Sequence, residues 1–117
     1  MKDEFLFEFE GDEPENDRNA RDLLDWMDED LRGSGRLRIN GPGEGELGGA
    51  ADAVIVPSGS VPLGRPFLDW LTERTKSRRI TLRVSATHKG ELLRIDVGDP
   101  VAAQELRSTI ARLLDEA

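Results

Sequence analysis

Few residues of this chain are of the types that catalyse reactions. The 117 residues include one histidine, His88, and no cysteine. Without cysteine the chain has no thiol nucleophile, no disulfide scaffold and no thiolate zinc site. His88 lies in the sequence Thr-His-Lys-Gly, which is typical of a turn between two strands, and no serine nucleophile pattern surrounds it. We therefore predict an exposed turn histidine and no catalytic residue.

The acidic residues suggest two further kinds of chemistry. The segment 12–17, Asp-Glu-Pro-Glu-Asn-Asp, offers carboxylate oxygens to a hard cation. It lacks the spaced acids, central glycine and terminal glutamate of an EF-hand loop, so we interpret it as a solvated loop and predict no metal site. Asp25 and Glu29 are spaced to share a helix face, but nothing in the sequence predicts the burial that raises the pKa of a catalytic acid.

A glycine-rich stretch, Gly-Pro-Gly-Glu-Gly-Glu-Leu-Gly-Gly at residues 41–49, superficially resembles a phosphate-binding loop. A Walker loop requires Gly-Lys followed by Ser or Thr, and a dinucleotide loop requires Gly-x-Gly-x-x-Gly between a strand and a helix. Here Glu44 and Glu46 would face the phosphates and repel them. We predict a flexible Gly/Pro-rich segment over residues 41–66 and no cofactor.

Negative charge is concentrated at the beginning of the chain. Residues 1–30 contain thirteen Asp and Glu against three Lys and Arg, a net charge of −10, whereas residues 31–117 contain eleven against thirteen, a net charge of +2. Like charge raises the energy of approach to nucleic acid phosphates and to anionic lipid. We therefore predict no nucleic acid and no membrane partner, and a basic protein surface as the partner of this region.

Size and composition predict one soluble domain over residues 1–117. The chain is 37% hydrophobic and 34% charged, which is typical of a globular protein. The first residues show no charged leader followed by a long apolar run, which predicts no secretory signal. The longest apolar stretch, near residues 50–56, is far shorter than the roughly 20 residues that span a bilayer. These features predict a cytoplasmic protein.

Alternating and helical periodicities predict the secondary structure. The first helix is expected to begin at Asn16 or Asp17 and to stop at Gly33, and Asp99 followed by Pro100 predicts the start of a closing helix. Strands are expected over residues 5–10, 36–40, 80–86 and 93–97. Helices are expected up to residue 31, in two short pieces over residues 47–56 and 66–76, and from residue 99 to residue 114.

Each predicted strand has one apolar and one polar face, which predicts helices on one face of the sheet only. We expect an α+β two-layer sandwich in the order β-α-β-α-β-β-α, with a four-stranded mixed sheet, ferredoxin-like in type. The open face would carry no aromatic ring on which a base could stack, which argues against RNA binding. Its charged residues would be Arg36, Arg38, Arg83, Arg94, Glu8 and Glu10.

Four segments of the chain are distinctive: Leu-Leu-Asp-Trp-Met-Asp-Glu-Asp-Leu-Arg-Gly, Gly-Arg-Leu-Arg-Ile, Gly-Glu-Leu-Gly-Gly-Ala-Ala-Asp-Ala-Val and Pro-Phe-Leu-Asp-Trp-Leu. In these segments the chain resembles the effector-associated constant component family of actinobacterial proteins. The most specific positions include Trp26 with Asp30, and Trp70 with Leu71. The resemblance implies a non-enzymatic adaptor or regulator in a bacterial conflict or defence system. It would be encoded beside varied effectors, such as caspase-like or trypsin-like peptidases and TIR-type domains.

We therefore hypothesise a protein-interaction adaptor that docks on a cognate effector. The alternative is an acidic inhibitor or antitoxin-type protein that occludes a basic active site, and an unrecognised hydrolase would require a buried carboxylate beside His88. The Trp26 ring could instead fold onto its own helix, and the sheet edges would also allow a homodimer. The predicted partner-binding residues are Asp25, Trp26, Asp28, Glu29, Asp30 and Trp70.

Overall fold

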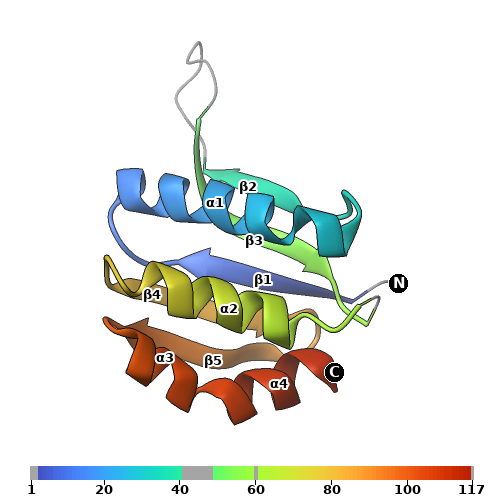
Figure 1. Cartoon of the computed structure of the whole chain (residues 1–117). Coiled ribbons are helices and arrows are strands. Elements are labelled where there is room, and N and C mark those ends of the chain that lie inside the picture. Colours follow the sequence, from blue (N-terminus) through green and yellow to red (C-terminus); the bar gives the residue numbers. More distant parts are fainter. Residues whose placement is uncertain (1–2, 41–48, 60, 117) are drawn as a thin grey trace.

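Five strands form one antiparallel sheet in the computed structural model, which describes residues 3–40, 49–59 and 61–116 (Figure 1). The strand order is β2-β3-β1-β4-β5, and every neighbouring pair is antiparallel. β2 and β5 are therefore the sheet edges. The strands are β1 (Glu4–Phe9), β2 (Arg36–Asn40), β3 (Ala50–Pro57), β4 (Ile80–Ala86) and β5 (Gly90–Val97).

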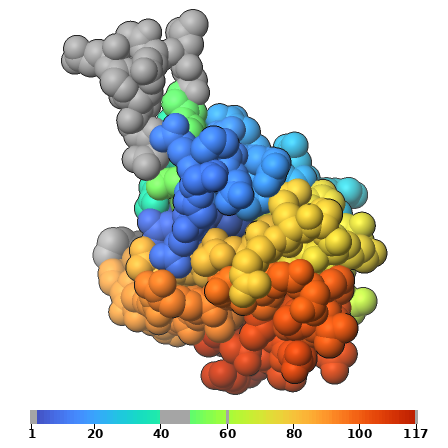
Figure 2. Space-filling model, turned by 90° about the vertical axis from the view of Figure 1, so that its left-hand side faces the viewer, coloured from blue at the N-terminus to red at the C-terminus, as the bar shows by residue number. Residues whose placement is uncertain are grey.

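The helices cover one face of this sheet and leave the other open, as predicted. In Figure 1 α2 lies between α1 and the pair α3 and α4, and in the side view of Figure 2 the helices occupy one side of the molecule. No helix in the described residues is both long and apolar enough to cross a membrane. The helices are α1 (Glu13–Leu31), α2 (Gly64–Arg74), α3 (Pro100–Glu105) and α4 (Arg107–Asp115).

The first six elements have the connectivity of a ferredoxin-like unit. β1 and β2 run parallel and are joined by α1, and β3 separates them in the sheet; β3 and β4 are joined by α2 in the same way, with β1 between them. β5, α3 and α4 extend this unit. The two-layer α+β class is confirmed, but the four-stranded mixed sheet and the element order β-α-β-α-β-β-α are wrong.

The error arises from the helix predicted over residues 47–56. Residues 50–57 form β3, and residues 47–48 of that prediction lie outside the described part of the chain. Of the predicted flexible segment 41–66, residues 41–48 and 60 lie outside it, and the rest includes β3 and the start of α2. The Ala-rich sequence favours a helix locally, but pairing with two strands overrides that preference. Phe7 of β1 lies opposite Val54 of β3. Between β2 and β3 the register shifts at Arg38 and Ile39, so these two neighbours lie opposite Ala53 and Ala51.

Capping residues set the helix ends. α1 begins earlier than predicted, because Asp12 is the N-cap: its Oδ1 accepts a hydrogen bond of 2.9 Å from the Glu15 N–H. The prediction of Asn16 or Asp17 as the cap is therefore wrong. Asp99 caps α3 as expected, accepting from the Ala102 N–H at 2.8 Å. The predicted closing helix is interrupted at Leu106 and forms α3 and α4.

The core lies between the sheet and the helices. Phe5, Phe7 and Phe9 alternate along β1 and are buried beneath the helical layer. The Phe67 ring of α2 lies 4.9 Å from that of Phe7, and the Trp70 ring lies 5.8 Å from that of Phe9, measured between ring centroids. α2 therefore lies over the middle of the sheet.

Candidate functional site

The charged residues predicted on the open sheet face are present, and they are paired with one another. Glu8 accepts hydrogen bonds from Arg38, at 2.6 Å, and from Arg83. Arg38 also donates to Asp52 at 2.9 and 2.8 Å. Five further ion pairs on this side join Arg36 to Glu4, Arg94 to Glu10, Arg94 to Glu91, Arg83 to Glu91 and Arg79 to Asp96. The face thus neutralises much of its own charge.

Removing the central carboxylate of this face should reduce stability in a pH-dependent way. Hydrogen bonds from Arg83 and Arg38 hold the pKa of Glu8 below its ordinary value of 4.5. The stabilisation is therefore complete above pH 4.5 and is lost as the pH falls through the lower pKa of the folded state. We expect Glu8→Gln to destabilise the protein at neutral pH, and the difference from wild type to shrink below that range. Denaturant unfolding at stepwise lower pH measures it, and Glu105→Gln, at an exposed position of α3, should show no comparable trend.

A second polar cluster joins α1 to α2 around Asp22. Its carboxylate accepts a 2.8 Å hydrogen bond from Trp70 Nε1 and two from Arg74, one of them 3.0 Å long. Arg78 donates to Asp22 at 3.5 Å and to the buried Asn19 at 3.0 Å. Burial raises the pKa of Asp22, but the hydrogen bonds from Arg74 and Trp70 outweigh this effect and hold it below 3.8. The cluster therefore joins the two helices as a polar, charge-paired contact.

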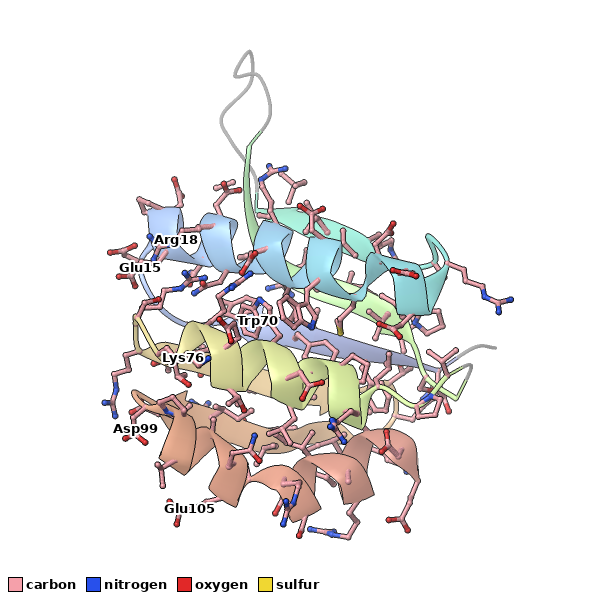
Figure 3. The ribbon with its side chains drawn as sticks, in the orientation of Figure 1. Glu15, Arg18, Trp70, Lys76, Asp99 and Glu105 are labelled. Carbon is pink, nitrogen blue, oxygen red and sulfur yellow. The ribbon has the colours of Figure 1, made fainter. Side chains whose placement is uncertain are left out.

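The two tryptophans, both predicted to contact a partner, occupy opposite environments. Trp70 is completely buried between α1 and α2 (Figure 3), so a partner cannot reach it in this conformation. Trp26 is 39% exposed on α1, and the guanidinium carbon of Arg74 lies 5.3 Å from its ring centroid. This is a cation–π contact across the two helices. Trp26 is thus held by α2 and still offers ring surface to solvent.

The four acidic residues predicted to bind a partner are exposed on the C-terminal half of α1, and we call them the acidic patch. The ion pairs of α1 involve Asp17 and Asp22 instead. In the described part of the chain, no basic nitrogen lies within 4.0 Å of any carboxylate of the patch. The acidic patch consists of Asp25, Asp28, Glu29 and Asp30.

The position of the acidic patch is unfavourable for the isolated helix. The carbonyl groups at a helix C-terminus carry partial negative charge, so acids there are destabilising and bases are stabilising. Asp28, Glu29 and Asp30 all lie in the last turn of α1, which contains no basic residue. A cation supplied from outside the chain would relieve this repulsion.

The remaining candidate residues take no part in a site. His88 lies in the β4–β5 turn as predicted, with a φ of 70°, and its Nε2 is 3.9 Å from Asp3 Oδ1. The acidic segment 12–17 forms the start of α1, where Asp12 serves as its cap. Within residues 3–40, 49–59 and 61–116, no three His, Cys, Asp or Glu side chains converge as metal ligands would.

Sequence reasoning missed Asp22 and Arg74, which connect the two tryptophans. Asp22 is one of thirteen acids in the first thirty residues, and Arg74, the last residue of α2, is the first of four basic residues between positions 74 and 79. The available signal was the spacing of four residues between Asp22 and Trp26, and again between Trp70 and Arg74, which places each pair on one helix face.

Comparison with known proteins agrees with the expected family. The protein family Effector Associated Constant Component 1 matches residues 11–114, from the residue before the α1 cap to the last turn of α4. No curated protein matches the chain, and no solved structure does. The family match covers well over half of the sequence and includes the acidic patch and both tryptophans. The chain therefore belongs to the Effector Associated Constant Component 1 family, whose name describes a constant component associated with effectors.

Proposed function

We propose that this protein is a non-enzymatic adaptor or regulator that binds a basic surface of a cognate effector through the acidic patch and Trp26. The observation that carries the proposal is the contrast between two acidic surfaces. The carboxylates of the open sheet face are paired with arginines of the same chain, whereas those of the acidic patch have no such partner in the described residues. Charges left unpaired at the unfavourable end of a helix are available to another molecule.

The arrangement fits the usual division of roles in a protein interface. Complementary charge mainly sets the rate and orientation of encounter, while a few large side chains supply most of the affinity. Trp26 is the exposed large side chain next to Asp25 of the acidic patch, and tryptophan is among the residues enriched at interface hot spots. Because Arg74 already holds its ring, Trp26 loses less conformational freedom on binding than an unsupported side chain would.

The effector is proposed from the family, and its class from the resemblance noted in the sequence. The expected partner is a caspase-like or trypsin-like peptidase or a TIR-type protein with a basic surface. Catalysis is assigned to that partner, because the single histidine of this chain lies in an exposed turn and no serine nucleophile pattern surrounds it.

The test is capture of the effector from native cytosol at low salt with the purified protein as bait. We expect wild type to retain the effector and the variant Trp26→Ala, Asp28→Lys, Asp30→Lys to lose it. Glu13→Lys with Glu105→Lys, which reverses two exposed charges outside the acidic patch, is the matched control and should retain it. If wild type and the triple variant captured equal amounts of the effector, the interface would lie elsewhere than on the end of α1.

Two further measurements refine the same proposal. The association rate constant should fall steeply as salt is raised, and a salt-independent rate would remove the electrostatic part. Effector turnover with and without this protein separates an adaptor from an acidic inhibitor, since only an inhibitor must lower turnover.

A further inference from the structure

The end of the molecule at which α1 stops contains a hollow of about 710 Å³. Three segments that are distant in sequence meet there: the start of β1, the end of α1 and the connection from β3 to α2, all at the right-hand side of Figure 1. The described residues that line it are Asp3, Asp30, Leu31, Arg32, Ser34, Pro57, Ser58, Gly59 and Val61. The hollow adjoins the acidic patch, because Asp30 belongs to both.

Two carboxylates from different elements line this hollow. Asp30 comes from the last turn of α1, and no basic nitrogen of the described residues lies within 4.0 Å of it. Asp3 precedes β1, and among the described residues the basic nitrogen within that distance is Nε2 of His88, at 3.9 Å. The backbone of Asp3 is fixed, since its carbonyl accepts a 3.0 Å hydrogen bond from the Ser58 N–H. The backbone that carries each carboxylate is therefore held by hydrogen bonds, at Asp3 to Ser58 and at Asp30 within α1.

The end of α1 adds further negative character. The negative end of the helix dipole lies here. The carbonyls of Asp28, Glu29 and Leu31 accept hydrogen bonds from residues 32–34, so the contribution of this end is that of the dipole and not of free acceptors. Arg32 closes α1 in the left-handed conformation, with a φ of 51°, and it is the one cation among the described lining residues. Against it stand two carboxylates and the helix terminus, so negative charge predominates among the described lining residues.

The hollow also has an apolar floor. Leu31 is buried, and the partly buried Val61 packs against the same core, with Pro57 beside them on the lining. A long basic side chain that buries its hydrocarbon stem on such a floor while its charged head meets carboxylates satisfies both parts of the site. Arginine suits it better than lysine, because a guanidinium offers five donors to several oxygen acceptors at once.

We propose that this hollow receives an arginine side chain of the bound effector. The inference rests on the proposed function and deepens it, since it assigns one chemical group of the partner to one place beside the acidic patch. An effector segment that crosses the end of α1 would then be held by Trp26 on one side and by a buried arginine stem on the other.

The test uses the full-length protein and a capped heptapeptide of glycine and serine with one central arginine. The comparison peptides carry citrulline, which has the same shape without the charge, or lysine. Titration at low salt, followed by backbone amide NMR shifts, should localise the arginine peptide to residues 30–34 and to Ser58, Gly59 and Val61. We expect citrulline to bind at least threefold more weakly and lysine to lie between the two.

Two variants with opposite expected effects test whether the peptide binds in this hollow or is attracted to the acidic protein in general. Asp3→Asn with Asp30→Asn should weaken binding of the arginine peptide about three- to tenfold, as the loss of two partly exposed charge contacts implies. Arg32→Asn removes the opposing cation, and asparagine tolerates the left-handed conformation, so it should strengthen binding. Glu13→Gln with Glu105→Gln removes two charges elsewhere and should change binding less than twofold.

The inference is overturned if the arginine and citrulline peptides bind alike, if the two double variants weaken binding equally, or if Arg32→Asn fails to strengthen it. Its failure is distinguishable from failure of the proposed function. Effector capture that is lost with Asp25→Asn and Glu29→Gln but kept with Asp3→Asn and Asp30→Asn would leave the acidic patch as the interface and remove the arginine from the hollow. Effector capture that is unaffected by both pairs would overturn both.

Discussion

Replacing Trp70 with alanine should lower the free energy of unfolding by about 3–5 kcal/mol, the range observed when a buried tryptophan is truncated. The ring is completely buried, and its centroid lies 5.8 Å from that of Phe9 and 6.4 Å from that of Phe67. Truncation also removes the indole Nε1–H of Trp70, which donates a hydrogen bond to the partly buried carboxylate of Asp22 between the helices. Denaturant unfolding followed by circular dichroism measures the loss.

A milder substitution keeps this prediction testable if the alanine variant does not fold. Trp70→Phe preserves most of the apolar contact but leaves Asp22 without its indole donor, and we expect a loss of about 1–3 kcal/mol. Trp26→Ala is the matched control, because that ring is partly exposed, and its effect on stability should be well below that of Trp70→Ala. A comparable loss at both tryptophans would contradict the assignment of one to the core and the other to the surface.

Reversing charge at the end of α1 should produce two effects of opposite direction. Asp28→Lys with Asp30→Lys exchanges repulsion from the helix dipole for attraction, and we expect a gain of about 1 kcal/mol in the free energy of unfolding. The same variant should lose most of its affinity for the effector, because its charges would face a basic surface. Unfolding curves and binding curves of one preparation measure both effects.

The other end of the same helix provides the control for this prediction. Glu13 and Glu15 lie in the first turn of α1, where the dipole favours negative charge. Glu13→Lys with Glu15→Lys should therefore lower stability and leave effector binding largely intact. If both charge reversals shifted stability in the same direction, net charge rather than helix position would be the cause.

Sequence patterns predicted the elements whose local and long-range preferences agree. The strict alternation of Phe5, Phe7 and Phe9 and the turn around His88 gave β1 and the β4–β5 hairpin correctly. The prediction for residues 47–56 was wrong because the register and burial of β3 depend on two partner strands, the preceding β2 and the distant β1, which lies more than forty residues earlier. An alanine-rich segment carries no local record of such neighbours.

The candidate site, too, was predicted only where local sequence was sufficient. Exposure of the acidic patch followed from helical periodicity, but the burial of Trp70 did not. α2 has helices on both sides, so its buried surface is wider than the stripe of a helix at the margin, and Trp70 falls within it. The position of a helix in its layer is a property of the whole topology. Periodicity within α2 alone therefore could not distinguish an interface tryptophan from a core tryptophan.

The contact of Arg74 with both helices makes the surface and the interior energetically interdependent. One guanidinium covers the Trp26 ring and also pairs with Asp22, which in turn accepts from the indole of Trp70. A bound molecule that displaced this guanidinium from the Trp26 ring would also change its pairing with Asp22, and a tighter pairing with Asp22 would make the guanidinium harder to displace. By thermodynamic reciprocity the two equilibria affect each other equally. Binding of a partner at α1 is therefore expected to be coupled to the packing between α1 and α2.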